Sequence, residues 1–433
     1  MEEVTVVIVG AGPAGIATSA CLNRLSIPNV VLERDDLKAP LWHKRTYDRL
    51  KLHLGKEFCQ LPFMPFPSNF PTFVPRIAFL RYLDNYVSHF NVTIKCNRLV
   101  ECASLIDHHK WEIVVKDTSW NKSEVYRCKY VVVASGENSE GCVPKIHGLD
   151  RFKGEYMHCS RYLNGRELYD KNVLVVGCGN SGMEIAYDLT NWGANTSLVV
   201  RNPVHVLSKE MVYIGMQMLK RVPVKTVDKV IVFMSRLRYG RINKYGFSRP
   251  KEGPFALKAA TGRSPTIDVG CMARIKEGQV KVFPSITSID NKRVEFDDGR
   301  AEEFDVIIFA TGYKSTVLKW LKDYKQLFKE NGMPKQRYPD HWKGQNGLYC
   351  AGFSSRGLMG ISEDAQCIAN DIHLALNNNN YNETHHAAKD VRNLNCDEES
   401  VSSDPLGTCK LIKVEFTMAA TSQDEPPKVK SHP

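Results

Sequence analysis

The feature that most constrains the fold of this 433-residue chain is a pair of G-x-G-x-x-G fingerprints, at residues 10–15 and 177–182. Each follows a β-rich apolar run, at 4–9 or 173–176, and precedes an apolar-periodic segment. The first glycine of such a fingerprint permits a tight turn, the second lets the backbone approach a pyrophosphate, and the third lets the helix pack on the strand. The pair therefore predicts two Rossmann-like units and electron transfer between two bound dinucleotides.

The residue that ends the second strand of each unit distinguishes the two ligands. Glu33 ends the first such strand, where a carboxylate can bind a ribose diol. Arg201 takes the corresponding place in the second unit, where a guanidinium can bind a 2′-phosphate. We therefore expect FAD at the N-terminal unit and NADPH at the second. The residues expected to bind these cofactors are Gly10, Gly12, Gly15, Glu33, Trp42, Gly177, Gly179, Asn180, Ser181, Gly182, Arg201, Thr311 and Gly312.

The order of the apolar runs predicts an α/β fold of two Rossmann-like domains, with the NADPH domain inserted into the FAD domain. The expected segments are the first part of the FAD domain at 1–165, the NADPH domain at 166–300, the FAD return segment at 301–376 and a polar, disordered tail at 377–433. The small-residue strand ends 134–136 and 310–312 would let the chain cross between the domains beside a cofactor.

Smaller elements follow from the same patterns. Residues 36–75, rich in proline, aromatic residues, lysine and arginine, are expected to cover the cofactor. A helix is expected at 75–90 and a small antiparallel element at 92–133. A final helix is expected at 364–376, and a stray strand in the tail at 411–418.

Charge and composition narrow the class of protein. The net charge is +10, no run of about 18 apolar residues is present to span a membrane, and the acidic start leads directly into a strand rather than a secretory signal. We expect a cytoplasmic protein and leave open an association with the surface of the endoplasmic reticulum. Basic residues do not cluster with aromatic residues as nucleic-acid binding requires, so a small-molecule substrate is expected; the oligomeric state stays open.

The thirteen cysteines include no Cys-x-x-Cys pair. A disulfide framework and a zinc or other metal site are therefore not expected. Flavoenzymes that reduce disulfides also bind two dinucleotides, but they need a redox-active cysteine pair beside the flavin. Without that pair, the reduced flavin is expected to pass its electrons to O2.

Residues 152–162 fit the pattern F-x-G-x-x-x-H-x-x-x-Y and stand between the two fingerprints. At this motif the chain resembles the class B flavin-dependent monooxygenases. It is further similar to their plant YUCCA branch over roughly residues 4–376. The segments that carry this likeness are 41–42, 45–54, 58–62, 249–251, 268–270, 309–313, 347–349, 352–353, 356–358 and 364–365.

The resemblance implies an NADPH- and O2-dependent conversion of indole-3-pyruvate to the auxin indole-3-acetic acid and CO2, through a peroxide at flavin C4a. The candidate catalytic residues are Lys51 and His53, which lie in the expected flavin-covering segment, and His158, the histidine of the motif. Two mild departures are Gly55, where the family prefers proline, and Ser135, where threonine is usual.

His53 stands where N- and S-oxygenating relatives carry an asparagine that faces the flavin, which argues against simple amine or sulfide oxygenation. For His158 the alternative is a buried ring that hydrogen-bonds the backbone at a domain junction. A cation is expected to hold the substrate carboxylate, and the candidates are Arg45, Arg49, Lys51 and His53.

Two other functions stay open: an oxygenase acting on another acceptor by N-, S- or Baeyer–Villiger oxygenation, and a cofactor-binding protein without activity. The stretch 212–234 also has several interpretations. It could line an apolar substrate tunnel, form a core-facing helix, or contact a membrane with Lys220, Arg221, Lys225 and Lys229 as its charged face.

Overall fold

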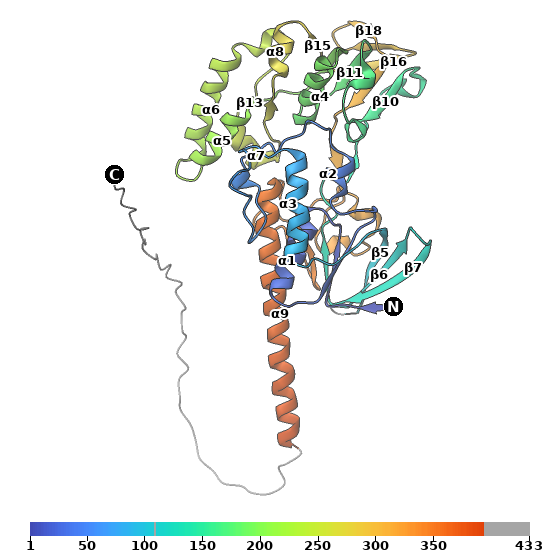
Figure 1. The fold of residues 1–433 in the computed structure, drawn as a ribbon, viewed down its shortest axis with the longest axis vertical. Helices are drawn as coiled ribbons and strands as arrows, with labels where there is room; N and C mark the ends of the chain where they lie inside the picture. The colour runs from blue at the N-terminus through green and yellow to red at the C-terminus, as the bar shows by residue number, and fades with distance from the viewer. Residues whose placement is uncertain (108–109, 394–433) are drawn as a thin grey trace, which may run out of the picture. The chain divides into compact units, whose positions relative to one another are not determined.

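The computed structural model describes residues 1–107 and 110–393, and its two fingerprints lie in two separate parallel sheets (Figure 1). The first sheet has the order β21 (Leu348–Cys350), β8 (Tyr130–Val133), β2 (Val6–Val9), β3 (Asn29–Leu32) and β4 (Ile94–Lys95). The second has the order β10 (Glu155–His158), β19 (Val306–Phe309), β11 (Asn172–Val176), β12 (Asn195–Val199) and β15 (Val280–Phe283). Both are parallel throughout, which confirms the predicted fold class of two dinucleotide-binding domains.

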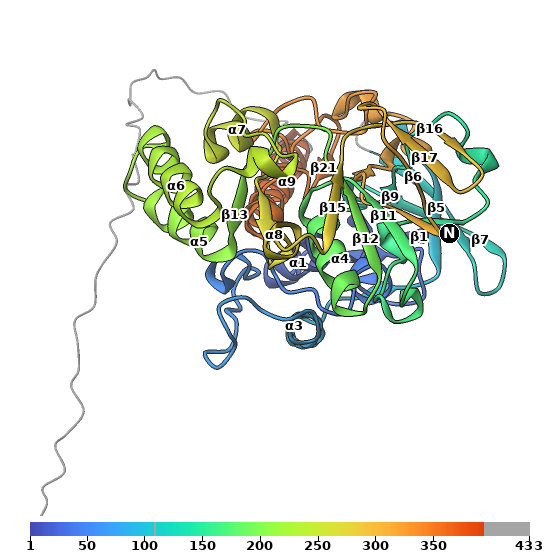
Figure 2. The ribbon, with the colours of Figure 1, turned by 90° about the horizontal axis from the view of Figure 1, so that it is seen from above.

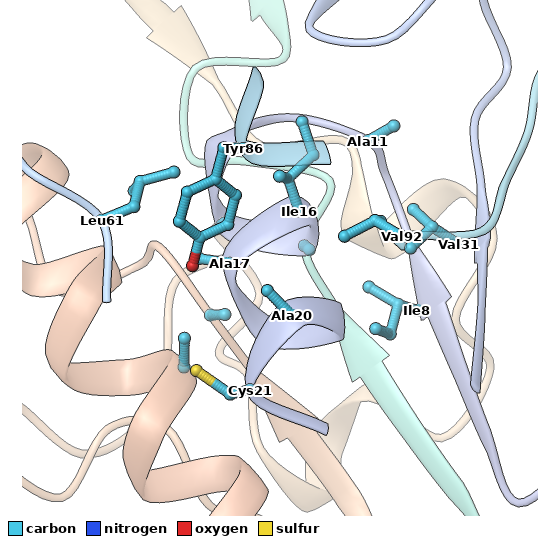
Figure 3. Close-up of a cluster of buried hydrophobic side chains, with 14 of the residues drawn as sticks. Ile8, Ala11, Ile16, Ala17, Ala20, Cys21, Val31, Leu61, Tyr86 and Val92 are labelled. Carbon is cyan, nitrogen blue, oxygen red and sulfur yellow. The ribbon is translucent and has the colours of Figure 1, made fainter. Parts of the chain in front are cut away.

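Valine and isoleucine dominate the central strands because both faces of a parallel sheet are covered. All four residues of β2 and of β8 are buried. One face of the first sheet is covered by α1 (Pro13–Arg24) and α3 (Arg76–His89), and one face of the second by α4 (Asn180–Asn191) and α8 (Cys271–Lys276). The opposite faces pack against antiparallel strands, around Trp111 in the first domain and around Phe296 in the second. Figure 3 shows Ala17 and Ala20 of α1 in the first core, close to Ile8 of β2 and Tyr86 of α3.

Each domain carries excursions from its sheet. In the first, β7 (Lys122–Cys128), β6 (Lys110–Asp117) and β5 (Arg98–Asp107) form an antiparallel sheet, to which β1 (Glu2–Glu3) adds in parallel beside β7. The helix α2 (Pro40–Lys44) lies in the covering segment. In the second are α5 (Lys209–Met218), α6 (Val224–Tyr239), α7 (Pro254–Thr261), β13 (Val206–Ser208), β14 (Thr266–Asp268), β16 (Ile286–Asp290), β17 (Arg293–Phe296) and β18 (Ala301–Glu303). The helix expected at 75–90 and the antiparallel element expected at 92–133 are thus present.

The sheets do not follow the expected boundaries at 165 and 300. β10 precedes residue 166 and β19 follows residue 300, yet both strands belong to the second sheet. They extend it because β19 pairs with β11, and β10 in turn pairs with β19. The FAD-domain sheet is rejoined only at β21.

The two segments that cross between the sheets pair with each other. β9 (Glu140–Gly141) lies on the outward crossing, β20 (Tyr313–Lys314) on the return, and the two strands are antiparallel. The small-residue motifs 134–136 and 310–312 stand directly before these crossings. This ladder joins the two domains where the chain leaves the first sheet after β8 and leaves the second sheet after β19.

The last helix, α9, spans Gly357–Asn393 and is longer than the helix expected at 364–376. It reaches into the segment expected to be a disordered tail, because no proline or glycine interrupts residues 377–393. Residues 1–377 form one compact unit. The rest of the tail, including the strand expected at 411–418, lies outside the described residues.

Two general features complete the fold. Within the described residues, the cysteines are free thiols. No helix in the same part of the chain is apolar over a length sufficient to cross a bilayer.

Candidate active site

A cavity of about 820 Å³ lies at the carboxyl end of the first sheet. Its wall combines the first fingerprint, the ends of β3 and β8, the covering segment around Trp42, the β9–β20 ladder and the start of α9. Ligands of open α/β sheets bind at this edge, because the loops and helix N-termini converge there. The volume falls within the range typical of small-molecule and cofactor sites.

The first fingerprint has the geometry that a bound pyrophosphate requires. Gly10 has φ +109°, and a Cβ there would lie 2.6 Å from the Ala134 carbonyl oxygen. A Cβ at Gly15 would lie 2.0 Å from the Gly10 carbonyl oxygen, whereas one at Gly12 would meet nothing within 4 Å. Gly12 thus leaves open space before the N-terminus of α1, where backbone N–H groups and the helix dipole favour an anion. These residues fit a dinucleotide.

Glu33 lies in the cavity wall with a carboxylate that is already hydrogen-bonded. It is 5% exposed and accepts from the Ala11 amide at 2.8 Å and from the Asp35 amide at 3.0 Å. Burial raises the pKa of Glu33, although these two amides act in the opposite direction. The carboxylate therefore fixes the fingerprint loop and also lies where a ribose diol would bind. Trp42 lines the same cavity.

The second fingerprint repeats the first. Gly177 has φ +110°, and a Cβ there would lie 2.5 Å from the Ala310 carbonyl oxygen. A Cβ at Gly182 would lie 1.8 Å from the Gly177 carbonyl oxygen, and one at Gly179 would meet nothing within 4 Å. The second site therefore also fits a dinucleotide. Arg201 is exposed and follows the end of β12, the strand that pairs with β11 before the fingerprint.

A segment that the sequence did not single out covers the second fingerprint. The Thr266 hydroxyl donates to the Cys178 carbonyl at 2.9 Å, and the Ile267 amide donates to Asn180 Oδ1 at 2.8 Å. Burial raises the pKa of Cys178 to about 11, and the nearby Arg263 acts to lower it. Arg263 is thus a cation close to the fingerprint. The basic turn at 262–263 was a signal that could have identified it.

His53 lies in a polar cluster against α4 rather than in the cavity wall. Its Nε2 is 3.3 Å from Glu184 Oε2, and its Nδ1 is 3.3 Å from Asn180 Nδ2. The Tyr47 hydroxyl donates to the same Glu184 oxygen at 3.0 Å. Burial alone would raise the pKa of Glu184, but the hydrogen bond and charge of His53 lower it overall. The cluster ties the covering segment of the first domain to the fingerprint helix of the second.

Sequence reasoning missed Glu184. Its signal was a carboxylate in α4 at the position where α1 carries the buried Ala17. Ser181, predicted to bind a cofactor, lies beside the Tyr47 hydroxyl in the same cluster.

His158 lies at the crossing between the domains, and both of its ring nitrogens have partners. It is 8% exposed; Nε2 is 3.0 Å from the Gly312 carbonyl oxygen, and Nδ1 accepts from the Ser160 amide at 3.2 Å. Because Nδ1 accepts, Nε2 carries the proton and donates to Gly312. Burial lowers the pKa of His158, against the effect of that bond. The geometry matches the backbone-bonding alternative; direct catalysis by His158 stays a prediction.

The remaining candidates occupy varied positions. Thr311 donates to the Cys142 carbonyl, and the Gly312 carbonyl also accepts from the Cys142 amide at 2.9 Å, so both stabilise the crossing. Among the candidate cations, Arg45 binds Asp35 at 3.0 Å and Arg49 stacks on Tyr187 at 4.4 Å. Lys51 is exposed, and its catalytic role stays a prediction.

Comparisons with known proteins bear on the chemistry of this site. The sequence profile of the family described as "Flavin-binding monooxygenase-like" matches residues 3–343. "Probable indole-3-pyruvate monooxygenase YUCCA10" of Arabidopsis thaliana is 52% identical over 86% of this chain and 97% of its own length. "Indole-3-pyruvate monooxygenase YUCCA6" of the same plant is 45% identical over 85% of this chain and 89% of its own length.

Solved structures support the fold independently. A flavin-containing monooxygenase from Stenotrophomonas maltophilia superposes with a TM-score of 0.66 at 18% identity, covering 87% of this chain and 100% of that one. Cyclohexanone monooxygenase in its ε-caprolactone-bound form superposes with a TM-score of 0.67 at 20% identity, covering 88% of this chain and 89% of that one. At these identities the likeness concerns the fold alone.

Proposed function

The chain belongs to the flavin-binding monooxygenase-like family, and we propose that it oxidises indole-3-pyruvate to indole-3-acetic acid with release of CO2. It is an FAD-containing, NADPH-dependent monooxygenase. One O2 and one NADPH are consumed per substrate: one oxygen atom enters the new carboxylate, and the other leaves as water. The reaction belongs to auxin biosynthesis.

One observation carries this proposal. The YUCCA10 relative shares about half of its residues with this chain across nearly its whole length. Both fingerprints, the cavity and the domain crossing lie within the region matched by the family profile, apart from the start of α9 and strand β21. The residues of the proposed site therefore lie almost entirely in the part of the chain that is similar to these monooxygenases.

The chain's own residues position the cofactors rather than perform the redox chemistry. When bound, FAD takes a hydride from NADPH and activates O2. Gly12 and the α1 N-terminus would hold the FAD pyrophosphate, and Glu33 would bind the ribose. Gly179 and the α4 N-terminus would hold the NADPH pyrophosphate, and Arg201 its 2′-phosphate.

Hydride transfer requires that the two domains hold their cofactors in a fixed relative position. Two groups of contacts between the domains can provide this. The Glu184 cluster binds the covering segment to α4. His158 binds the β9–β20 ladder through Gly312. We therefore propose positioning roles for His53 and His158, with neither side chain moving a proton to the substrate.

The proposed activity can be tested directly on the purified flavoprotein. NADPH consumption is followed with and without indole-3-pyruvate, and the product is identified by mass spectrometry with ¹⁸O2. We expect turnover stimulated by substrate, with one indole-3-acetate formed per NADPH and one ¹⁸O atom in its carboxylate. A flavin that NADPH reduces but that yields only hydrogen peroxide would overturn the substrate and leave the fold standing.

We also propose that the protein works in the cytoplasm and contacts the endoplasmic reticulum surface through α6. Phe233 and Leu237 of that helix are 61% and 72% exposed, and the exposed Lys225 and Lys229 precede them on the same face at four-residue spacing. The only acidic residue of α6, Asp228, is buried and accepts from backbone amides of α7. An apolar stripe flanked by cations favours an anionic membrane surface.

Flotation with lipid vesicles tests this location. We expect the protein to float with vesicles that contain phosphatidylserine, less at high salt, and not with neutral phosphatidylcholine vesicles. The double variant F233S/L237S should lose flotation and keep its NADPH oxidation. Equal flotation of the wild type with both kinds of vesicle, or with neither, would overturn the proposed contact.

A further inference from the structure

A short helix of the second domain, α7, packs against the first domain near the cofactor cavity. In both views α7 lies next to the beginning of α9 (Figure 1, Figure 2). A Cβ built at Gly262, which ends α7, would lie 3.9 Å from Ser355 in the loop that leads into α9. The Arg337 side chain also donates to the Ala260 carbonyl at 3.4 Å. The C-terminal end of α7 is therefore fixed against the α9 side of the cavity.

Lys258 is a half-buried cation at this contact. Its ammonium donates to the Gly262 carbonyl at 2.8 Å. Among the side chains that the structure describes, at residues 1–107 and 110–378, no carboxylate forms an ion pair with it. An ammonium has three donors, and one carbonyl satisfies only one of them. Burial lowers the pKa of Lys258, as expected for a charge without a close counter-ion.

The acidic group whose charge acts on Lys258 belongs to the cavity wall. Glu137 lines the cavity wall after β8, and the Ser355 hydroxyl donates to it at 3.0 Å. The charges of Glu137 and Lys258 influence each other, although the two groups are not in contact. Burial raises the pKa of Glu137. Lys258 is therefore a cation within electrostatic range of the cavity wall, although its side chain does not itself line the cavity. The carboxyl group that it senses, Glu137, has its charged form disfavoured.

The neighbouring cavity wall is apolar. Leu358 and Ile361, in the first turns of α9, both line the cavity. A ligand that enters here would meet a cation and apolar side chains together. That combination suits a small aromatic molecule with one negative group, because the ring buries apolar surface while the anion satisfies the free ammonium donors.

We propose that Lys258 binds the carboxylate of a 2-oxo acid substrate at the α9 end of the cavity and so selects acids over neutral ketones. The inference rests on the proposed function, which supplies a 2-oxo acid. It departs from the sequence-based expectation, in which the cation came from the covering segment. There, Arg45 and Arg49 already bind Asp35 and Tyr187.

The test compares Lys258→Met with the wild-type holoenzyme on two ligands. For indole-3-pyruvate we expect KM to rise roughly 10- to 100-fold, the range for one lost hydrogen bond to a charged group. For 1-(indol-3-yl)propan-2-one, which has a methyl group in place of the carboxylate, the Kd measured by flavin fluorescence should stay within about twofold. The rate of flavin reduction by NADPH without substrate should not change.

Two further variants separate a binding role from a structural one. Lys258→Arg keeps the charge and should retain a KM within several-fold of the wild type. Lys276→Met removes an exposed lysine of the same domain and should match the wild type throughout. An unchanged KM in Lys258→Met would overturn the proposal. So would an equal loss of affinity for the acid and the neutral ketone, which would indicate a structural role.

The outcome also distinguishes this inference from the proposed function. If the wild type forms no indole-3-acetate, the proposed function fails. Titration of the oxidised holoenzyme with indole-3-pyruvate and with phenylpyruvate then still tests Lys258 as a carboxylate site. Weaker binding of both acids to Lys258→Met would support the inference, and equal binding to both proteins would overturn it.

Discussion

The two dinucleotide-binding domains share one backbone design and differ in how they use it. Each has a five-stranded parallel sheet with the fingerprint strand third in order, and the first glycines have φ +109° and +110°. In both, the first glycine packs against the alanine carbonyl that follows a neighbouring strand, Ala134 or Ala310. The two loops share this backbone conformation because a turn that accepts a pyrophosphate allows few others.

The side chains around the two loops differ. Glu33 is buried, binds two amides of its own domain and is part of the first loop's structure. Arg201 is exposed, and its charge is available to a ligand. Ala17 of α1 lies in the core, whereas Glu184 at the same place in α4 binds the other domain. The first domain is therefore expected to retain its cofactor, and the second to exchange it.

The largest effect is expected from adding a methyl group at the third glycine of each loop. In Gly15→Ala the new Cβ would lie 2.0 Å from a backbone oxygen, and in Gly182→Ala 1.8 Å. We expect Gly15→Ala to be purified without flavin. Gly182→Ala should stay yellow, with flavin reduction by NADPH slower by roughly 100-fold, as overpacking of about 3 kcal/mol implies. Absorbance at 450 nm and stopped-flow reduction measure both.

The second glycines provide matched controls, because Gly12→Ala and Gly179→Ala place their Cβ in open space. These variants should keep the wild-type melting temperature and lose cofactor affinity only. A Gly15→Ala protein that is purified with a full complement of FAD would contradict the expected clash in the first loop.

Glu184→Ala makes α4 resemble α1 at this position and should give the next largest effect. The change leaves Tyr47 and His53 without their common acceptor. Loss of one partner from a buried polar cluster costs about 2 to 3 kcal/mol in the free energy of unfolding. Chemical denaturation measures the stability, and stopped-flow reduction should be slower as the domains loosen. Glu184→Gln should recover part of both; unchanged stability in Glu184→Ala would contradict the role of the cluster.

Arg201→Gln tests whether the exposed residue serves the ligand alone. We expect KM for NADPH to rise roughly 10- to 100-fold through loss of charge-assisted bonds to the 2′-phosphate. KM for NADH and the melting temperature should stay as in the wild type. The opposite pattern is expected for Glu33→Gln, which should lower stability and flavin content because Glu33 is buried in its loop. A parallel rise in KM for NADPH and NADH would argue against a phosphate contact.

The smallest effect is a change in the pH dependence of stability in His158→Asn. Because burial lowers the pKa of His158, the folded protein keeps the ring neutral where the unfolded chain already binds a proton. Stability of the wild type should therefore fall as pH drops below about 6.5, until the folded pKa is reached. His43 and His205, whose pKa values burial also lowers, contribute in the same direction. Denaturation at pH 7 and pH 5.5 should show a smaller decrease for His158→Asn; an equal decrease would place the titration elsewhere.

The sequence predicted those parts of the site that depend on residues close together in the chain. The fingerprints, their strands, Glu33 and Arg201 all lie within about 25 residues of their loops. It could not predict the partners of His53, because Glu184 and Asn180 lie 131 and 127 residues away. For the same reason it misplaced the sheet membership of β10 and β19, which only strand pairing decides.

By itself, the sequence determined that two dinucleotides bind, in which order, and with which family's chemistry. The glycines do so because few backbone conformations admit a pyrophosphate, and a short motif specifies those conformations. The tertiary structure alone decided which side chains hold the domains together and which cation remains free beside the cavity. Glu184, His158 and Lys258 depend on contacts between distant segments, and a local pattern carries no information about the packing that brings those segments together.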